Sequence, residues 1–392
     1  MTFWRRWIGA ESRGALDRWL LGGVLALSVW GLLMVYSSSS AMGVVSHRGN
    51  DLFYLQSQLT RWIVGLLLLL GLSHLSVRQL GGRWGWAIWA VSVALLILVI
   101  LIGVESRGAK RWMPFLNGQI QPSEFARLGM LILLAGLLSR QRGRLNTWRG
   151  LAAPIGATVI TAGLIAAEPH LSMAILVGAS GLLLIFLAGG SFWRLLVTGV
   201  GCGVLATLGG RAYHAARLTS FAQGMQGEAG YQALQSKLGI ASGGLFGMGL
   251  GHGMQKHFFL PDPHTDFILS IIGEELGLVG ILVLLGVTAG LVLRIFTTGT
   301  RATTAFSTLL TWGIGLQLMF GFLLHTIVCL AWGPTTGVAF PLISFGGSAL
   351  ISNMIALGLV LSISRRGNAP EPAPSYLGSL LLVEPHAGRG RP

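Results

Sequence analysis

The sequence is poor in charge, and especially in acidic residues. Only 10% of its 392 residues are charged, with 13 Asp and Glu against 27 Lys and Arg. An average soluble domain has about 25% charged residues, so this composition cannot cover a soluble surface. Hydrophobic residues make up 53% of the chain, and the mean hydropathy is +0.70. These values exclude a soluble protein and a largely disordered one, and they predict a polytopic membrane protein.

Cysteine is scarce as well. The two cysteines, Cys202 and Cys329, each lie inside an apolar run and are poor disulfide candidates. The spacing of His252, His257 and His264 matches no common zinc site, and no cysteine lies nearby to complete one. The sequence therefore predicts no metal ligands.

Apolar stretches long enough to cross a hydrocarbon core about 30 Å thick follow one another along the chain. We expect about ten transmembrane helices and an all-α fold, because a backbone in lipid must satisfy its own hydrogen bonds. The expected spans are 19–41, 58–76, 84–103, 121–139, 151–167, 171–189, 193–210, 266–293, 303–331 and 344–364. The first run is too long for a signal-peptide core, so we interpret it as a retained span.

The basic residues predict the orientation. One set of loops and ends holds 17 of them and the alternate set holds 8, with Arg61 and Arg127 inside spans. By the positive-inside rule, both termini are cytoplasmic. We expect a cytoplasmic segment over 1–18, a membrane domain over 19–365, a large outer loop over 211–265 and a disordered cytoplasmic tail over 366–392. The formal charge of +14 falls in short clusters between apolar runs, so it does not predict nucleic-acid binding.

The outer loop contains a glycine-rich run, Gly243 to Gly251. A nucleotide-binding interpretation fails because no strand precedes the run and ATP is absent on that side. We expect tight backbone packing or a re-entrant turn.

Ionisable side chains at membrane depth need a partner or a task. Glu124 and Arg127 are three residues apart and share one helix face, which favours an internal ion pair over direct contact with substrate. We expect Arg61 of the second span to join them.

The densest polar constellation surrounds the start of the eighth span, from Leu260 to Gly277. Asp266 lies at the outer mouth, where it is either the N-cap of the helix or a functional carboxylate. Glu274 lies about 80° round the helix and ~12 Å deeper, so it can face the same cavity, whereas Glu275 is turned away.

Six blocks, taken together and in order, resemble the SEDS family, named for shape, elongation, division and sporulation. The blocks are Arg107 to Trp112, Gln121 to Arg127, Gly230 to Ser236, Ser242 to Gly244, Leu260 to Gly277 and Pro334 to Ser348. The resemblance covers nearly the whole chain. The stretch from Gly251 to Lys256, ahead of Leu260, is more similar to the division branch than to the elongation branch.

The chain departs from the family pattern at several positions. Glu168 to Met173 reads Glu-Pro-His-Leu-Ser-Met, where Gln-Pro-Asp-Leu-Gly-Thr is usual, so an acidic residue has moved by two positions. Arg127 stands where lysine is usual, Asp262 where glutamate is usual and His325 where asparagine is common.

The resemblance implies a peptidoglycan glycosyltransferase that polymerises lipid II at the outer face of the cytoplasmic membrane during cell division. It implies inverting transfer, with Asp266 as the general base. The residues expected to bind substrate, including the leaving diphosphate, are Arg111, Arg217, Lys256 and Glu274. Glu124, Arg127 and Arg61 are expected to support the cavity. No cofactor is certain, although a divalent cation (Mg or Mn) could share the neutralisation of the diphosphate.

The resemblance also implies partners: a class B penicillin-binding transpeptidase (FtsI-like) and other division proteins at the septum. Two other functions stay open, a lipid II flippase and a non-catalytic division scaffold. The richest motif lies at one outer mouth and not at the membrane midplane, which favours an enzyme over a transporter.

Overall fold

A computed structural model describes residues 14–106, 109–115, 118–141, 143–208 and 228–367 of the chain. Its first helices are α2 (Arg18–Ser46), α3 (Phe53–Ser73), the short η1 (Val77–Gln79) and η2 (Leu80–Trp84), and α4 (Gly85–Ile102). Three strands follow, β1 (Val104–Ser106), β2 (Ala109–Phe115) and β3 (Gly118–Ile120). The remaining helices are α5 (Pro122–Arg140), α6 (Trp148–Ala167), α7 (Leu171–Leu187), α8 (Phe192–Leu208), α10 (Glu228–Ser242), α11 (Ile268–Thr300), α12 (Ala305–Cys329) and α13 (Gly347–Gly367).

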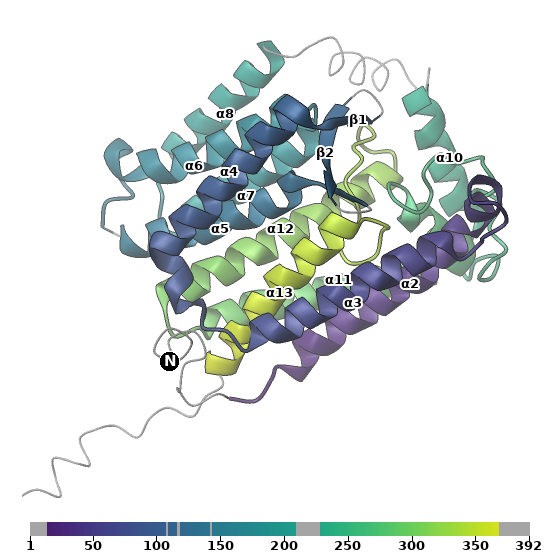
Figure 1. Cartoon of the computed structure of the whole chain (residues 1–392), viewed down its shortest axis with the longest axis horizontal. Coiled ribbons are helices and arrows are strands. Elements are labelled where there is room, and N and C mark those ends of the chain that lie inside the picture. The colour runs from purple at the N-terminus through teal and green to yellow at the C-terminus, as the bar shows by residue number, and fades with distance from the viewer. Residues whose placement is uncertain (1–13, 107–108, 116–117, 142, 209–227, 368–392) are drawn as a thin grey trace, which may run out of the picture.

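The predicted helical membrane fold is confirmed. In the described part of the chain, 8 helices are long and apolar enough to cross a membrane, and two shorter apolar helices cover Leu171–Leu187 and Phe192–Val204. These ten helices correspond to the ten spans expected from the sequence. Figure 1 shows them side by side as a bundle, with α12 and α13 near its centre.

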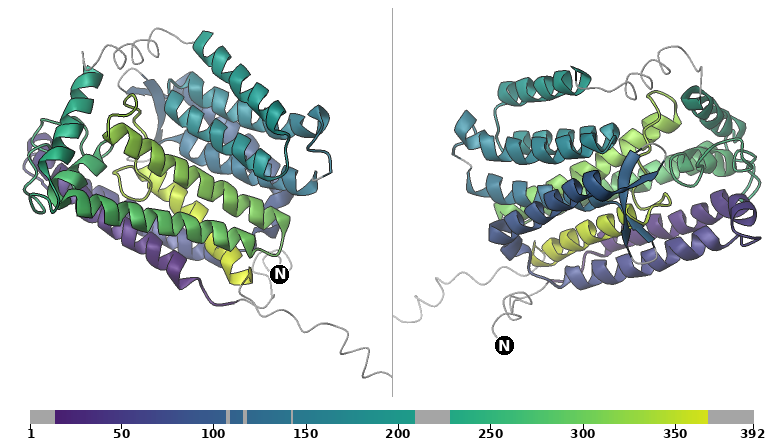
Figure 2. Two further views of the ribbon diagram at one scale, coloured as in Figure 1. Left: turned by 180° about the vertical axis from the view of Figure 1, so that it is seen from behind. Right: turned by 45° about the horizontal axis from the view of Figure 1, so that its top comes forward.

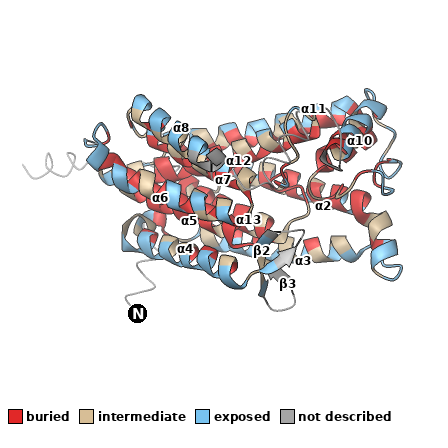
Figure 3. Cartoon of the chain, turned by 90° about the horizontal axis from the view of Figure 1, so that it is seen from above, coloured by how far each residue is buried: buried red, intermediate tan, exposed pale blue. Residues whose placement is uncertain are grey.

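The helices differ sharply in how much of their surface is buried. Within the most apolar stretch of each, α5 is 83% buried and α13 78%, whereas α3 is 17% and α4 22% buried. Figure 3 shows the buried residues gathered at the centre of the bundle. The exposed residues of α3 and α4 include many large apolar side chains, such as Leu67 and Leu101. That distribution is typical of a membrane protein, in which lipid covers the outer surface.

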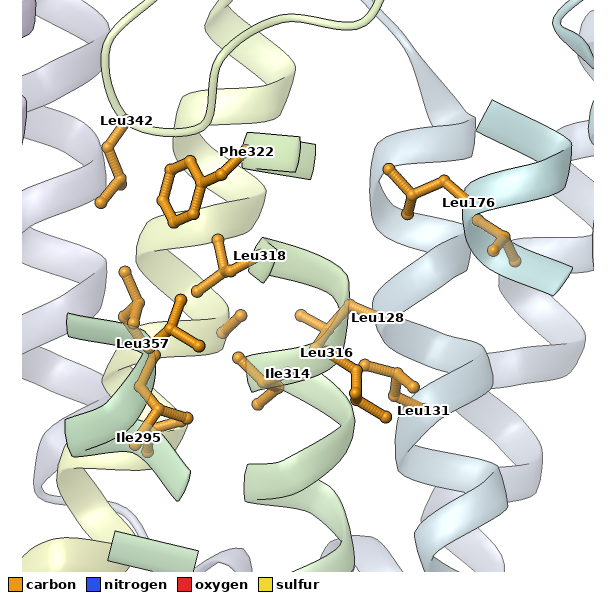
Figure 4. Close-up of a cluster of buried hydrophobic side chains, with 14 of the residues drawn as sticks. Leu128, Leu131, Leu176, Ile295, Ile314, Leu316, Leu318, Phe322, Leu342 and Leu357 are labelled. Carbon is orange, nitrogen blue, oxygen red and sulfur yellow. The ribbon is translucent and has the colours of Figure 1, made fainter. Parts of the chain in front are cut away.

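The core includes apolar side chains of α5, α7, α11, α12 and α13, to which α2 adds Leu20, Val24 and Leu27. Figure 4 shows one part of it, with Leu128 and Leu131 of α5 facing α12. Small residues allow the helices to approach closely: a Cβ added at Gly313 of α12 would lie 3.0 Å from side-chain atoms of Leu131 and Leu184. Close packing of this kind drives helix association where lipid removes the hydrophobic effect.

The start of α2 and the end of α13 lie together at one end of the bundle. The N-cap of α2 is Asp17, whose carboxylate accepts a hydrogen bond from the Leu20 amide and pairs with Arg294 of α11 at 2.8 Å. The Gly14 amide donates to the Arg365 carbonyl at 2.8 Å. These contacts hold the amino-terminal end of the described chain against α11 and α13.

The strands form a small antiparallel sheet in the order β1-β2-β3, which the sequence did not predict. It connects α4 to α5 at the other end of the bundle. Figures 1 and 2 show it at the same end as α10 and the segment between α12 and α13. This end therefore collects the polar motifs found in the sequence.

Helix α11 is broken near its start, at Gly277 (φ 68°, ψ −167°). The glycine-rich run packs against this break: the amides of Met248 and Gly249 donate to the carbonyls of Glu274 and Glu275 at 2.9 and 3.0 Å. A Cβ at Gly247 would lie 2.2 Å from the Glu275 carbonyl oxygen, so only glycine fits at this position. The tight backbone packing expected of this run is confirmed.

Candidate active site

A cavity of about 270 Å³ lies between β2, the turn joining α6 to α7, and α12 with the segment that follows it. Its lining contains both polar and apolar residues, called here its polar wall and its apolar wall. The polar wall comprises Arg111, His170, Ser172, Thr335 and Thr336. The apolar wall comprises Leu171, Ile175, Leu324, Ile327 and Val328, with Pro169, Gly333 and Pro334 completing the lining. A lining of this mixed composition suits an amphiphile with an anionic head and a hydrocarbon tail.

Arg111 reaches the cavity from β2. Its Nε donates to the Glu168 carbonyl at 3.3 Å and its Nη2 to the Pro169 carbonyl at 2.6 Å. These bonds fix the guanidinium against the α6–α7 turn, so the small sheet serves to carry this cation to the cavity. A guanidinium has five N–H donors, and its geometry matches phosphate oxygens.

Glu168 ends α6 beside Arg111. Its side chain is 1% exposed, and neither carboxylate oxygen hydrogen-bonds to a residue that the structure describes. Burial raises the pKa of Glu168 to about 8, although the nearby positive charge of Arg111 lowers it in part. The carboxyl group is therefore largely neutral at pH 7. Two residues on, the His170 ring is within hydrogen-bond distance of the Gln121 amide, at 3.3 Å.

Asp266 lies against the segment that lines the cavity. A Cβ built on Gly337, the residue after Thr336, would be 3.5 Å from Asp266 Oδ2, and Gly337 has a φ of +64°. The N-cap of α11 is Phe267, with no side-chain cap. The interpretation of Asp266 as the N-cap is therefore wrong, because the helix begins one residue too late for it. Asp266 itself is half-buried.

The loop that carries Asp266 is fixed by its neighbour His264. The His264 carbonyl accepts a hydrogen bond from the Phe345 amide at 2.9 Å. Its ring packs against Tyr54 and Phe345, with centroids 4.7 and 5.4 Å apart. This aromatic cluster joins the Asp266 loop to α3 and to the segment before α13.

Glu124 and Arg127 form an ion pair inside the bundle. Arg127 Nη2 lies 2.9 Å from Glu124 Oε2 and donates to Asn353 Oδ1 of α13 at 2.6 Å. Arg61 was expected beside them. The contact described for its guanidinium is instead with the ring of Phe345, at 5.2 Å from the centroid.

Glu274 and Lys256 both hold the loop that follows the glycine-rich run, residues 252–267, to α11. Glu274 accepts the amides of Met254 at 2.7 Å and Gln255 at 3.1 and 3.2 Å. Lys256 is 5% exposed and pairs with Glu275 at 2.8 Å. The expected orientation of Glu274 toward the cavity of Asp266 is not what the structure shows, because the loop folds over it. Substrate binding by Lys256 and Glu274 stays a prediction.

Glu275, which the sequence turned away from Asp266, also accepts the Ser37 hydroxyl at 2.6 and 2.7 Å. Arg217 lies outside the described residues, so its predicted role stays a prediction. The cavity also includes His170, Thr335 and Thr336, which the sequence did not single out as site residues. The Thr-Thr-Gly block that begins at 335 was visible as a motif, but its place in space was not.

Within the residues that the structure describes, no three His, Cys, Asp or Glu side chains are grouped to hold a metal ion. The divalent cation expected from the resemblance stays a prediction.

A family model for cell cycle proteins, of the FtsW, RodA and SpoVE type, matches residues 18–369. The chain belongs to this family. The resemblance to SEDS proteins is thereby confirmed over residues 18–369 of the chain.

Curated relatives within the FtsW/RodA/SpoVE family carry the name "probable peptidoglycan glycosyltransferase FtsW". The one from Alkalilimnicola ehrlichii is 36% identical over 372 residues, covering 92% of this chain and 92% of its own. The one from Trichlorobacter lovleyi is 34% identical, covering 89% of this chain and 93% of its own. These names agree with the division branch expected from the sequence.

Solved structures agree with the fold. A chain of a peptidoglycan synthase complex, described as coordinating polymerization and crosslinking, has a TM-score of 0.75 and 30% identity, covering 90% of this chain and 98% of its own. The rod shape-determining protein RodA of Thermus thermophilus has a TM-score of 0.68 and 30% identity, covering 90% of this chain and 97% of its own.

Proposed function

We propose that this FtsW/RodA/SpoVE family member is a peptidoglycan glycosyltransferase that polymerises lipid II. The names of its relatives at 34% and 36% identity support the activity. One observation of the structure carries the proposal: Asp266 Oδ2 lies 3.5 Å from a Cβ built on Gly337, the residue that follows Thr336 in the lining of the cavity that also holds Arg111. Transfer of a sugar from a diphosphate requires a base for the acceptor hydroxyl and positive charge for the leaving group.

The proposed reaction is an inverting displacement. The 4-hydroxyl of the acceptor glucosamine loses its proton to Asp266 and attacks C1 of the donor sugar. The bond between C1 and the diphosphate oxygen breaks, and undecaprenyl diphosphate leaves with the electron pair. Arg111 neutralises the developing charge on that leaving group. A positioned general base contributes typically 10²–10⁴-fold to such a step.

The apolar wall of the cavity supports a lipid-linked donor. Ile175 and Ile327 line the cavity and are themselves 59% and 38% exposed. In a membrane, exposed isoleucines on α7 and α12 face hydrocarbon. The diphosphate can therefore sit beside Arg111 while its polyprenyl chain runs along these helices into the lipid.

We further propose that both termini are cytoplasmic and that the β-sheet end of the bundle faces outward, at the septum. The excess of basic residues, 17 against 8, supports this orientation. A class B penicillin-binding transpeptidase is the proposed partner, since a similar solved complex is described as coordinating polymerization with crosslinking.

The test is polymerisation of purified lipid II by the detergent-solubilised chain with its cognate transpeptidase. Asp266→Asn is the test variant, and Asp262→Asn is the matched control, because it makes the same change four residues away. We expect glycan ladders from the wild type and from Asp262→Asn, and none from a folded Asp266→Asn. Ladders from Asp266→Asn would remove it as the base. Transport of lipid II in vesicles without polymer would support a flippase, and neither activity would support a scaffold.

A further inference from the structure

The carboxyl group of Glu168 is a buried acid beside the cavity that the proposed reaction does not use. Its side chain is 1% exposed, and no described residue hydrogen-bonds to either oxygen. Its own backbone carbonyl, and that of Pro169, hold the Arg111 guanidinium. The acid and the cavity cation are thus fixed next to each other by the main chain.

The charge of this acid changes within an accessible pH range. Burial raises the pKa of Glu168 to about 8, and the positive charge of Arg111 opposes that rise. The group is mostly neutral at pH 7 and mostly ionised at pH 9. An ionised Glu168 would offset the charge of Arg111, which is the cation on the polar wall of the cavity.

We propose that Glu168 is a positioning residue whose protonation sets how strongly Arg111 holds a lipid-linked diphosphate in the cavity. With a neutral carboxyl group, the cavity keeps the full positive charge of Arg111. With an ionised carboxylate, that charge is offset and the bound anion is repelled. The inference rests on the proposed function, because the diphosphate is the leaving group of that reaction.

The departure of residues 168–173 from the family pattern changes where the acidic residue lies relative to the cavity. The usual aspartate of the pattern falls at position 170, which lines the cavity, and the usual glutamine at position 168, behind Arg111. In this chain His170 occupies the lining position, and the acidic residue is Glu168, which lies next to Arg111 outside the lining. The cavity itself therefore carries no acidic side chain among its lining residues, all of which the structure describes.

The other charges packed around the α6–α7 turn have partners of their own. On α5, Glu124 and Arg127 pair with each other. On α12, the His325 ring contacts the Val338 carbonyl at 2.9 Å, and His170 contacts Gln121. Helix α4 carries no ionisable residue. Arg111 is thus the charge that acts on Glu168.

The experiment measures binding of farnesyl diphosphate to the purified full-length chain in detergent, by calorimetry, from pH 7.5 to 9.5. This range avoids most of the titration of histidine, which has an ordinary pKa near 6.5. The variants are Glu168→Gln, which restores the residue usual in the family, and Asp262→Asn as a control carboxylate away from Arg111. Thermal unfolding confirms that each variant is folded.

We expect the Kd of the wild type to rise about tenfold over this range, because one pKa unit of coupling corresponds to a factor of about ten. The Kd of Glu168→Gln should stay nearly constant, so that the variant binds more tightly than the wild type at pH 9.5. Asp262→Asn should follow the wild type. A ratio of wild-type to Glu168→Gln Kd that does not change with pH would overturn the inference, as would loss of binding by folded Glu168→Gln at pH 7.5.

Polymerisation of lipid II by the same preparations separates this inference from the proposed function. A wild type that binds the probe with the expected pH dependence, yet forms no glycan, contradicts the glycosyltransferase proposal and leaves the role of Glu168 standing. A wild type that forms glycan, with a Kd ratio independent of pH, contradicts the role of Glu168 alone.

Discussion

Two buried acids of this protein, Glu124 and Glu168, have opposite surroundings. Glu124 is 5% exposed and pairs with Arg127, which also binds Asn353. Glu168 is 1% exposed, and neither of its oxygens hydrogen-bonds to a described residue. The first carboxylate belongs to a network that joins α5 to α13, whereas the second lies beside a cavity. Burial alone therefore does not distinguish a structural acid from a functional one.

The partners make the distinction. A buried charge needs a partner of opposite charge and good geometry, or it becomes neutral. Glu124 has such a partner in Arg127, and Glu275 has one in Lys256. Glu168 instead becomes largely neutral at pH 7, because burial raises its pKa to about 8. An acid kept neutral beside a cation leaves that cation able to hold an anionic ligand, and the predictions below test this contrast.

The largest loss of stability is expected from Arg127→Met. It leaves Glu124 buried without its cation, and removing one partner of a buried pair costs about 3–5 kcal/mol. Arg127→Lys is the control, because it keeps the charge and restores the residue usual in the family. Thermal unfolding in detergent compares the two. Equal stability of Arg127→Met and the wild type would show that Glu124 needs no partner, which removes the contrast with Glu168.

A smaller loss, about 2–4 kcal/mol, is expected from Lys256→Met, since Ser37 still donates to Glu275 after the cation is removed. The double variant Lys256→Met with Glu275→Gln should recover part of the loss, because no buried charge then lacks a partner. Unfolding of the single and double variants gives the coupling. Additive effects would show that Lys256 and Glu275 do not depend on each other.

The fold was largely predictable from the sequence. Apolar runs of about 20 residues indicate membrane helices by length alone, and the three-residue spacing of Glu124 and Arg127 places them on one face. The small sheet was missed because strands of three to seven residues in a polar connection carry no distinctive pattern. Its role in carrying Arg111 to the cavity depends on tertiary contacts with the α6–α7 turn.

The site was only partly predictable, for the same reason. Asp266 was identified by its motif, but its spatial neighbour Gly337 is separated from it in the sequence by the whole of α11 and α12. Glu274 has a helical position compatible with the Asp266 cavity. The loop that follows the glycine-rich run nevertheless folds over it, and amides of that loop donate to its carboxylate. Helical geometry predicts the direction of a side chain and does not predict what a loop places there.

Glu168→Gln should change stability in the opposite direction and raise it, by about 5 kcal/mol at pH 8 or above. The folded pKa, about 8, is above the ordinary value of 4.5. Between these values the unfolded chain is ionised while the folded chain keeps its proton, so the wild type loses stability as pH rises. Below pH 4.5 the carboxyl group is neutral in both states and costs nothing.

The gain of Glu168→Gln over the wild type should therefore be small near pH 4.5, grow up to pH 8 and level off above it. Thermal unfolding of both proteins over this range measures it. A gain that is the same at pH 5 and pH 9 would mean that the pKa of Glu168 is not raised in the folded protein.

The smallest effect on stability, about 1 kcal/mol, is expected from Gly337→Ala. Its φ of +64° disfavours a side chain, and the added methyl group would lie 3.5 Å from Asp266 Oδ2. Gly346→Ala is the control, because its Cβ meets only Ala349 and Ala339, at 3.7 and 3.9 Å. Although the loss of stability is minor, a methyl group beside the Asp266 carboxylate would displace water and the acceptor hydroxyl from the proposed base. Lipid II polymerisation should therefore fall severalfold. Wild-type polymerisation by Gly337→Ala would show that the working carboxylate does not face this wall. The cavity of Arg111 and the base would then have to be treated as separate sites.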